Sequence, residues 1–167
     1  METYLLTQSN QFGFKKKLGT DQCIFALKEL VNKYMGKGSC VYTCFLDASK
    51  AFDRVNHSIL FQKLSDKGVP GYLIHLLIFW YENQTMCIRW GSRMSEKFNV
   101  SNGVRQGSIL SPHLFKIYVD DLSVALNGKK IGCVVNNMII NHLMYADDIV
   151  LISPSSIGLI KLIDTCH

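Results

Sequence analysis

Residues 142–153 read HLMYADDIVLIS and place two adjacent acids, Asp147 and Asp148, between two apolar runs. The apolar residues over 138–144 and 149–152 predict two strands joined by the turn 145–148. A third run of strand length, VYTCFL over 41–46, delivers Asp47 at its carboxyl end. If these strands are neighbours in one sheet, the three acids converge at one edge.

Clustered carboxylates carry a specific chemical implication. Three of them repel one another and are costly to desolvate, so a cluster needs counter-cations. Oxygen ligands with open positions suit Mg²⁺, and two such ions about 3.5–4 Å apart clamp the oxygens of a phosphoryl displacement. An Asp-Asp pair is also ordinary turn chemistry between two strands. The residues alone therefore leave a metal site and a plain hairpin both open.

A second acidic doublet, Asp120-Asp121, has a different context. It lies within a helix expected to begin at Ser111-Pro112, where apolar residues recur at steps of one, three or four. Successive helical residues point about 100° apart, so this pair is not presented as strand ends would present it. We interpret both residues as solvated or helix-packing acids.

The rest of the chain mixes helical and strand patterns without a regular βαβ repeat, which favours an α+β fold. Ser111 is expected to cap the helix that runs to about Leu126. Strands over 86–90 and 97–100 form a predicted hairpin across Gly91-Ser92. A further helix is expected after a cap at Thr20 or Asp21 and before Gly36, with Ile24, Leu27, Leu30 and Val31 on one face. Another is expected after Asn56, with Ile59, Leu60 and Leu64 inward, and a third at 72–82.

Length and composition bound the class of protein. The 167 residues suit one domain, and 48% hydrophobic content excludes a disordered polymer. The net charge of +5 favours polyanionic partners. Six scattered cysteines indicate reduced thiols in an intracellular protein, nuclear or cytoplasmic, rather than a zinc site. We expect no secretory signal and no membrane span, because the longest apolar run is far shorter than the roughly 20 residues required.

Four motifs together resemble the reverse transcriptases of non-LTR (LINE-like) retrotransposons. FLDASKAFDRVNH from Phe45 is similar to the family's first catalytic motif, and SNGVRQGSILSPHLF from Ser101 to its second. HLMYADDIVLIS is similar to the third, and QFGFKKKLGT from Gln11 resembles the stretch that closes the fingers region. One Y-A-D-D box is weak evidence, but four motifs in family order are strong.

The resemblance implies roles for particular residues. Asp47 and Asp147 would be the principal ligands of Mg²⁺, with Mn²⁺ possible as a substitute, and Asp148 an accessory member. The Ala48 carbonyl is a further candidate ligand. Phe52 matches the bulky residue beneath the nucleotide sugar, where a ring excludes a 2′-hydroxyl; it is equally a core aromatic at a strand-to-helix junction.

Other matched positions imply contacts with nucleotide or nucleic acid. Gln106 and Gly107 match the loop that approaches the incoming nucleotide and template, although a glycine turn before a helix needs no such role. The candidates for nucleic-acid contact are Lys15, Lys16, Lys17, Arg105 and Tyr145. A solvated basic run and ordinary strand packing are the alternatives, and we favour the solvated reading for the lysines.

The implied architecture is an antiparallel polymerase palm over 41–167, with inserted helices, preceded by a partial fingers segment over 1–40. The family's upstream fingers strands and its thumb are expected to lie outside this chain. The implied activity is RNA-directed DNA polymerisation, with an RNA template, a DNA primer and deoxynucleoside triphosphates as partners. The rest of a longer retrotransposon polyprotein is a further candidate partner. A catalytically inactive relic that binds nucleic acid weakly and a two-metal nuclease are the alternatives.

Overall fold

The computed structural model describes residues 6–166 and divides into two units, which we treat separately. The sheet unit comprises residues 7–49 and 119–166, and the helical unit comprises residues 50–118 with Leu6. The boundary between fingers and palm expected at 40/41 stays a prediction; the helix of the expected fingers segment packs on the sheet. The first five residues of that segment, and His167, lie outside the described residues.

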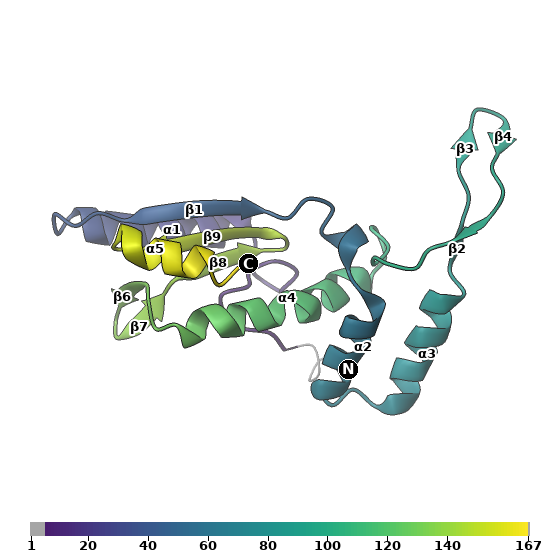
Figure 1. Ribbon diagram of the computed structural model, residues 1–167. Coiled ribbons are helices and arrows are strands. Elements are labelled where there is room, and N and C mark those ends of the chain that lie inside the picture. The colour runs from purple at the N-terminus through teal and green to yellow at the C-terminus, as the bar shows by residue number, and fades with distance from the viewer. Residues whose placement is uncertain (1–5, 167) are drawn as a thin grey trace. The chain divides into compact units, whose positions relative to one another are not determined.

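The sheet unit is built on three antiparallel strands in the order β1-β9-β8 (Figure 1). Their bounds are Tyr42–Asp47 for β1, Asp148–Ser153 for β9 and His142–Tyr145 for β8. The α+β class with an antiparallel sheet is therefore confirmed. β9 pairs with β1 along the whole of β1 and with β8 along the whole of β8. This pairing brings the first and third motifs side by side.

The strand expected at 138–144 is two strands. β7 (Met138–Ile140) pairs with β6 (Cys133–Val135) in a separate hairpin, and β8 begins at His142. Asn141 lies between them, wholly buried, and its Nδ2 donates to the Leu126 carbonyl at 2.7 Å. This buried polar anchor marks the point where the chain leaves one sheet and enters the other.

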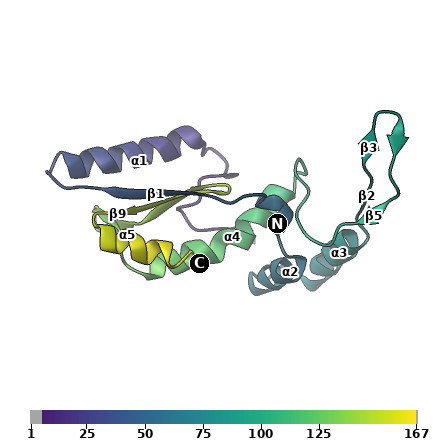
Figure 2. The same ribbon diagram turned by 45° about the horizontal axis from the view of Figure 1, so that its top comes forward.

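Helices cover both faces of the sheet (Figure 2). On one face, Leu30 of α1 (Thr20–Met35) packs in a cluster with Leu143 and Val150. On the other, Leu151 packs with Leu126 of α4 (Ser111–Gly128) and Leu162 of α5 (Ser156–Ile163). Val150 and Leu151 are neighbours in sequence, and strand alternation sends them to opposite faces.

α1 forms where expected but differs in two details. Gly19 occupies its N-cap, and the Gln22 side chain accepts from the Gly19 amide at 2.7 Å, so neither Thr20 nor Asp21 caps it. Ile24 is 63% exposed rather than buried with Leu30.

The helical unit begins with the short 3-10 helix η2 (Phe52–Arg54), followed by α2 (His57–Asp66) and α3 (Gly71–Glu82). Asn56 caps α2 as predicted, because its Oδ1 accepts from the Ile59 amide at 3.1 Å. Leu60 and Leu64 are buried, whereas Ile59 is 47% exposed. Adjacent helical positions point about 100° apart, and Ile59 lies on the side of α2 that stays open to solvent.

The predicted hairpin forms in two short ladders. β2 (Thr85–Met86) pairs with β5 (Phe98–Asn99), and β3 (Arg89–Trp90) pairs with β4 (Arg93–Met94). The tip is the expected two-residue turn, with Gly91 at a φ of +59°. That value suits glycine, which has no Cβ to clash.

α4 begins without the predicted serine cap. The amides of His113 and Leu114 donate to the Leu110 carbonyl at 3.0 and 3.1 Å, so Leu110 holds the cap position and Ser111 is the first helical residue. Among the described residues, no helix combines the length and apolarity needed to cross a membrane.

Candidate active site

Two of the candidate acids face each other across the sheet. The β1–β9 register pairs Asp47 with Asp148, and the β8–β9 register pairs Asp148 with Tyr145. Both carboxylates are exposed. The prediction that the acid-bearing strands are neighbours is therefore confirmed.

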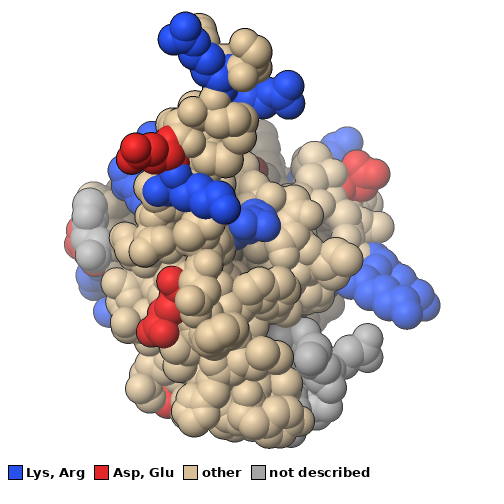
Figure 3. Space-filling model, turned by 90° about the vertical axis from the view of Figure 1, so that its right-hand side faces the viewer, with Lys and Arg blue, Asp and Glu red and all other residues tan. Residues whose placement is uncertain are grey.

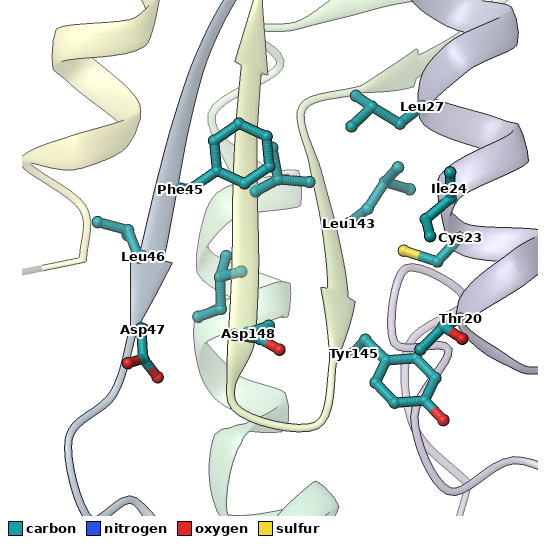
Figure 4. A pocket seen from close by; sticks show the side chains of 12 residues that line it. Thr20, Cys23, Ile24, Leu27, Phe45, Leu46, Asp47, Leu143, Tyr145 and Asp148 are labelled. Carbon is teal, nitrogen blue, oxygen red and sulfur yellow. The ribbon is translucent and has the colours of Figure 1, made fainter.

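These acids lie at one end of a groove between α1 and the sheet (Figure 4). The remainder of the groove is lined mainly by apolar side chains, among them Ile24, Leu27 and Phe45. Phe45 is 72% exposed although it lies two residues before Asp47. The site thus combines a carboxylate pair with an open apolar surface.

Asp147 is placed differently from its neighbour. It is half-buried in the turn before β9 and does not line the groove. Within residues 6–166, no group of three or more His, Cys, Asp or Glu side chains is arranged to hold a metal ion. The expected convergence of all three acids is thus not seen in this part of the chain, because Asp147 lies in the turn that precedes β9, whereas Asp47 and Asp148 occupy paired strand positions.

The Asp47–Asp148 pair nevertheless fits a hard divalent cation. It supplies carboxylate oxygens from two strands and leaves its outer side open to solvent. Mg²⁺ is bound by one or two carboxylates while it retains waters or phosphate oxygens. Two facing acids therefore meet the minimum donor set for Mg²⁺.

The acidic doublet of α4 has a structural role. Asp120 is 7% exposed and its Oδ1 accepts from the Gln8 amide at 2.9 Å, whereas Asp121 is exposed. The interpretation of this pair as helix acids is confirmed.

Phe52 packs inside the helical unit. Its ring stacks on Phe115 with centroids 4.5 Å apart and planes 12° from parallel. Its carbonyl accepts from the Val104 amide at 2.8 Å, which ties η2 to the loop over 101–107. The core-aromatic reading of Phe52 thus has direct support, and its contact with a nucleotide sugar stays a prediction.

The loop of the second motif is held at its base and exposed at its tip. Gly103 has a φ of +89°, donates to the Val55 carbonyl at 2.8 Å and would place a Cβ only 2.9 Å from the Asp53 Cα. Arg105, Gln106 and Gly107 are exposed. Arg105 and Gln106 border a groove in the helical unit, where they are accessible to a ligand.

The three lysines are not equivalent. Lys15 Nζ donates to the carbonyls of Thr7 and Gln8, so this ammonium is engaged by its own segment. Lys16 and Lys17 are exposed. Tyr145 is half-buried at the end of β8, beside Asp148, where it lines the groove.

The tip of the hairpin is basic and aromatic, a feature not predicted from the sequence. Trp90 is 85% exposed between Arg89 and Arg93, both of which are exposed. Figure 3 shows basic side chains standing out at this tip. The signal was available in R-W-G-S-R, because exposed aromatic and arginine side chains together suit base stacking and phosphate contact.

Burial makes three of the six thiols poor nucleophiles. All six cysteines are free. Burial raises the pKa of Cys23, Cys133 and Cys166, which disfavours the reactive thiolate at each.

One known protein family matches almost the whole chain. The family described as reverse transcriptase (RNA-dependent DNA polymerase) matches residues 2–167. The chain belongs to this family. The resemblance to reverse transcriptases of non-LTR retrotransposons is thus confirmed, and with it the class of enzyme from which the chain derives.

The reverse transcriptase relatives are retrotransposon proteins. The chain is 35% identical over 158 residues to the Pol polyprotein of the type-2 retrotransposable element R2DM of Drosophila melanogaster, covering 92% of this chain and 14% of that protein. It is 32% identical over 148 residues to the RNA-directed DNA polymerase from mobile element jockey of Drosophila funebris, covering 87% and 15%. The chain therefore spans about a seventh of the length of these relatives.

Solved structures show the same fold. Apo telomerase from Candida tropicalis matches with a TM-score of 0.70 at 15% identity, covering 93% of this chain and 32% of that chain. Telomerase from Candida albicans, solved with a fragment of telomeric RNA, matches with a TM-score of 0.66 at 12% identity, covering 98% and 29%. The similarity of the backbone to these structures thus supports the polymerase palm fold that the motifs predict.

Proposed function

We propose that this reverse transcriptase domain adds deoxynucleotides to a DNA primer on an RNA template. The observation that carries the proposal is the register pair Asp47–Asp148 at the open end of an antiparallel sheet, in a chain of this family. Phosphoryl transfer depends mainly on positioning and charge neutralisation, which two facing carboxylates and a bound cation supply.

The metal ligands would be Asp47, Asp147 and Asp148, with the Ala48 carbonyl as a further oxygen. Bound Mg²⁺, or Mn²⁺ in its place, neutralises phosphate charge and polarises the reacting oxygens. The resemblance makes Asp147 a principal ligand and Asp148 an accessory one. The strand register supports a larger role for Asp148 in binding the metal, since this residue faces Asp47 directly.

Other residues would select and hold the substrates. Phe52 would exclude a 2′-hydroxyl, and Gln106 and Gly107 would approach the incoming nucleotide and template. Arg105, Lys16, Lys17 and Tyr145 would contact nucleic acid, with Lys15 supporting its own segment. Because the chain spans about a seventh of its relatives, we propose that it acts within a longer polyprotein.

Primer extension on an RNA template in Mg²⁺ tests this function. We expect Asp47→Asn and Asp147→Asn each to lower incorporation by at least about a hundredfold, the order of effect of removing one electrostatic group at a reacting centre. Asp121→Asn is the matched control, since this acid is exposed on α4, and it should extend as the parent does. Equal incorporation by Asp47→Asn and the parent would refute the assignment.

The exposed Lys16 and Lys17 also suit one alternative, a non-catalytic relic that binds nucleic acid weakly. Binding that falls steeply with salt, with no incorporation by the parent, would select it. Metal-dependent strand cleavage without nucleotide addition would instead select a nuclease.

A further inference from the structure

A buried glutamine lies against the turn that carries the candidate metal ligands. Gln11 is 2% exposed, and its segment forms a short parallel bridge with β8. The Phe12 amide donates to the Met144 carbonyl at 2.7 Å, and the Met144 amide donates to the Asn10 carbonyl at 2.8 Å. These bonds bring a segment near the start of the chain to the edge of the strand that leads into the turn.

The Gln11 side chain then continues this ladder by one step. Its Nε2 donates to the Ala146 carbonyl at 3.1 Å, and its Oε1 accepts from the Ala146 amide at 3.1 Å. The same Oε1 accepts from the Gly13 amide at 2.8 Å. One amide group thus satisfies both backbone groups of the residue immediately before Asp147.

Ala146 needs such support because of its backbone conformation. It has a φ of +57°, in the left-handed region that side chains other than glycine seldom adopt, and it is 8% exposed. Without Gln11, the backbone N–H and C=O of Ala146 would lose these hydrogen-bond partners in a site shielded from water. A strained conformation persists only where its surroundings determine it.

Gly13 permits the close approach. A Cβ at this position would overlap the Ala146 backbone nitrogen, so any other residue would push the segment away from the turn. The contact is therefore built from two residues of QFGFKKKLGT acting on one residue of YADD.

We propose that Gln11 is a positioning residue that holds the Ala146–Asp147 turn, and through it Asp147 and Asp148, in the geometry that receives a divalent cation. Gly13 acts with it by allowing the approach. The inference rests on the proposed function only in assigning these acids to a metal. The clamp itself is a property of the folded chain.

Gln11→Met tests the clamp because it keeps the side-chain volume and removes all three hydrogen bonds. We expect amide hydrogen exchange at Ala146 and Gly13 to accelerate by at least about tenfold, the factor expected for loss of one net hydrogen bond. Amides of the β1–β9 ladder should exchange as in the parent. Gln62→Met is the matched control, since Gln62 is exposed on α2 and its Nε2 donates to Asp66 Oδ1 across one helical turn.

Mn²⁺ titration provides the second readout. Paramagnetic broadening of the Asp147 and Asp148 resonances should require severalfold more Mn²⁺ in Gln11→Met than in the parent or in Gln62→Met. If Gln11→Met does not fold, Gln11→Asn keeps the amide group but shortens the side chain by one methylene, which withdraws it from the Ala146 amide and carbonyl. It should then accelerate exchange at Ala146 and weaken Mn²⁺ binding in the same direction.

Unchanged exchange at Ala146 would overturn the clamp, and so would acceleration spread evenly over the whole sheet, which would mark a general structural role. Unchanged Mn²⁺ binding would overturn the positioning role. A parent chain that fails to extend a primer but shows these shifts would refute the proposed function and leave the clamp standing.

Discussion

Acidification is expected to weaken the sheet unit through one buried histidine. His142 is wholly buried, and burial lowers its pKa from 6.5 to about 4. The neighbouring amide settles its tautomer: Asn141 Nδ2 donates to the Leu126 carbonyl, so Asn141 Oδ1 accepts from His142 Nδ1 at 2.6 Å. Nε2 therefore accepts from the Ser123 hydroxyl, also at 2.6 Å, and the ring is neutral.

The size of the effect follows from the change in pKa. The folded state favours the neutral ring, so the stabilisation is complete above pH 6.5 and is lost as the pH falls toward 4. A pKa lowered from 6.5 to about 4 corresponds to about 3 kcal/mol of unfolding free energy. Between pH 6.5 and 4, the unfolding free energy falls by up to about 1.4 kcal/mol for each pH unit of acidification.

Urea unfolding, followed by circular dichroism from pH 7.5 to 4, measures this dependence. His142→Gln should be less stable at pH 7.5 and should lose less stability on acidification. His113 contributes in the same direction, since burial and Lys116 lower its pKa, so the difference between parent and variant isolates His142. His75→Gln, at an exposed site on α3, is the control. Equal acid slopes in the parent and His142→Gln would refute the reasoning.

Three further changes test other parts of the molecule. Asn56→Ala removes the cap of α2 and should lower the unfolding free energy by about 1 kcal/mol in urea titration; no change would show that the cap is dispensable. Phe52→Val should raise the ratio of ribonucleotide to deoxynucleotide incorporation by about tenfold or more. An unchanged ratio would show that Phe52 does not select the sugar and serves only to stack on Phe115. Replacing both Arg89 and Arg93 with Ala should reduce the salt slope of RNA binding by about 2, whereas an unchanged slope would exclude the hairpin tip from the interface.

Local patterns predicted the elements more reliably than their ends. The strand bearing Asp47 and the turn bearing Asp147 were identified because apolar runs of strand length flank them. Asn56 was correctly placed as a cap, but Gly19 and Leu110 took the caps assigned to Thr20 or Asp21 and to Ser111. A residue whose side chain can cap a helix competes with neighbouring residues that can occupy the N-cap position with their backbone alone. The local sequence does not determine which of them becomes the N-cap.

Burial was misjudged where a residue adjoins the core without facing it. Ile24 and Ile59 are as apolar as Leu30 and Leu60, yet they remain exposed. Periodicity identifies an apolar stripe, but the width of the stripe that is covered depends on what packs against it. Ile24 instead lines the groove that ends at the candidate acids.

The family, the order of the motifs and the identities of the acids follow from residue types and local spacing. Long-range packing is needed to place Asp148 rather than Asp147 opposite Asp47, and to bond Gln11 to Ala146, 135 positions along the chain. Strand register is set by packing on both faces of a sheet, and a shift of one residue exchanges the faces. The buried bonds of Gln11 to Ala146 form only once its segment, β8 and the turn have come together, so no local pattern contains them.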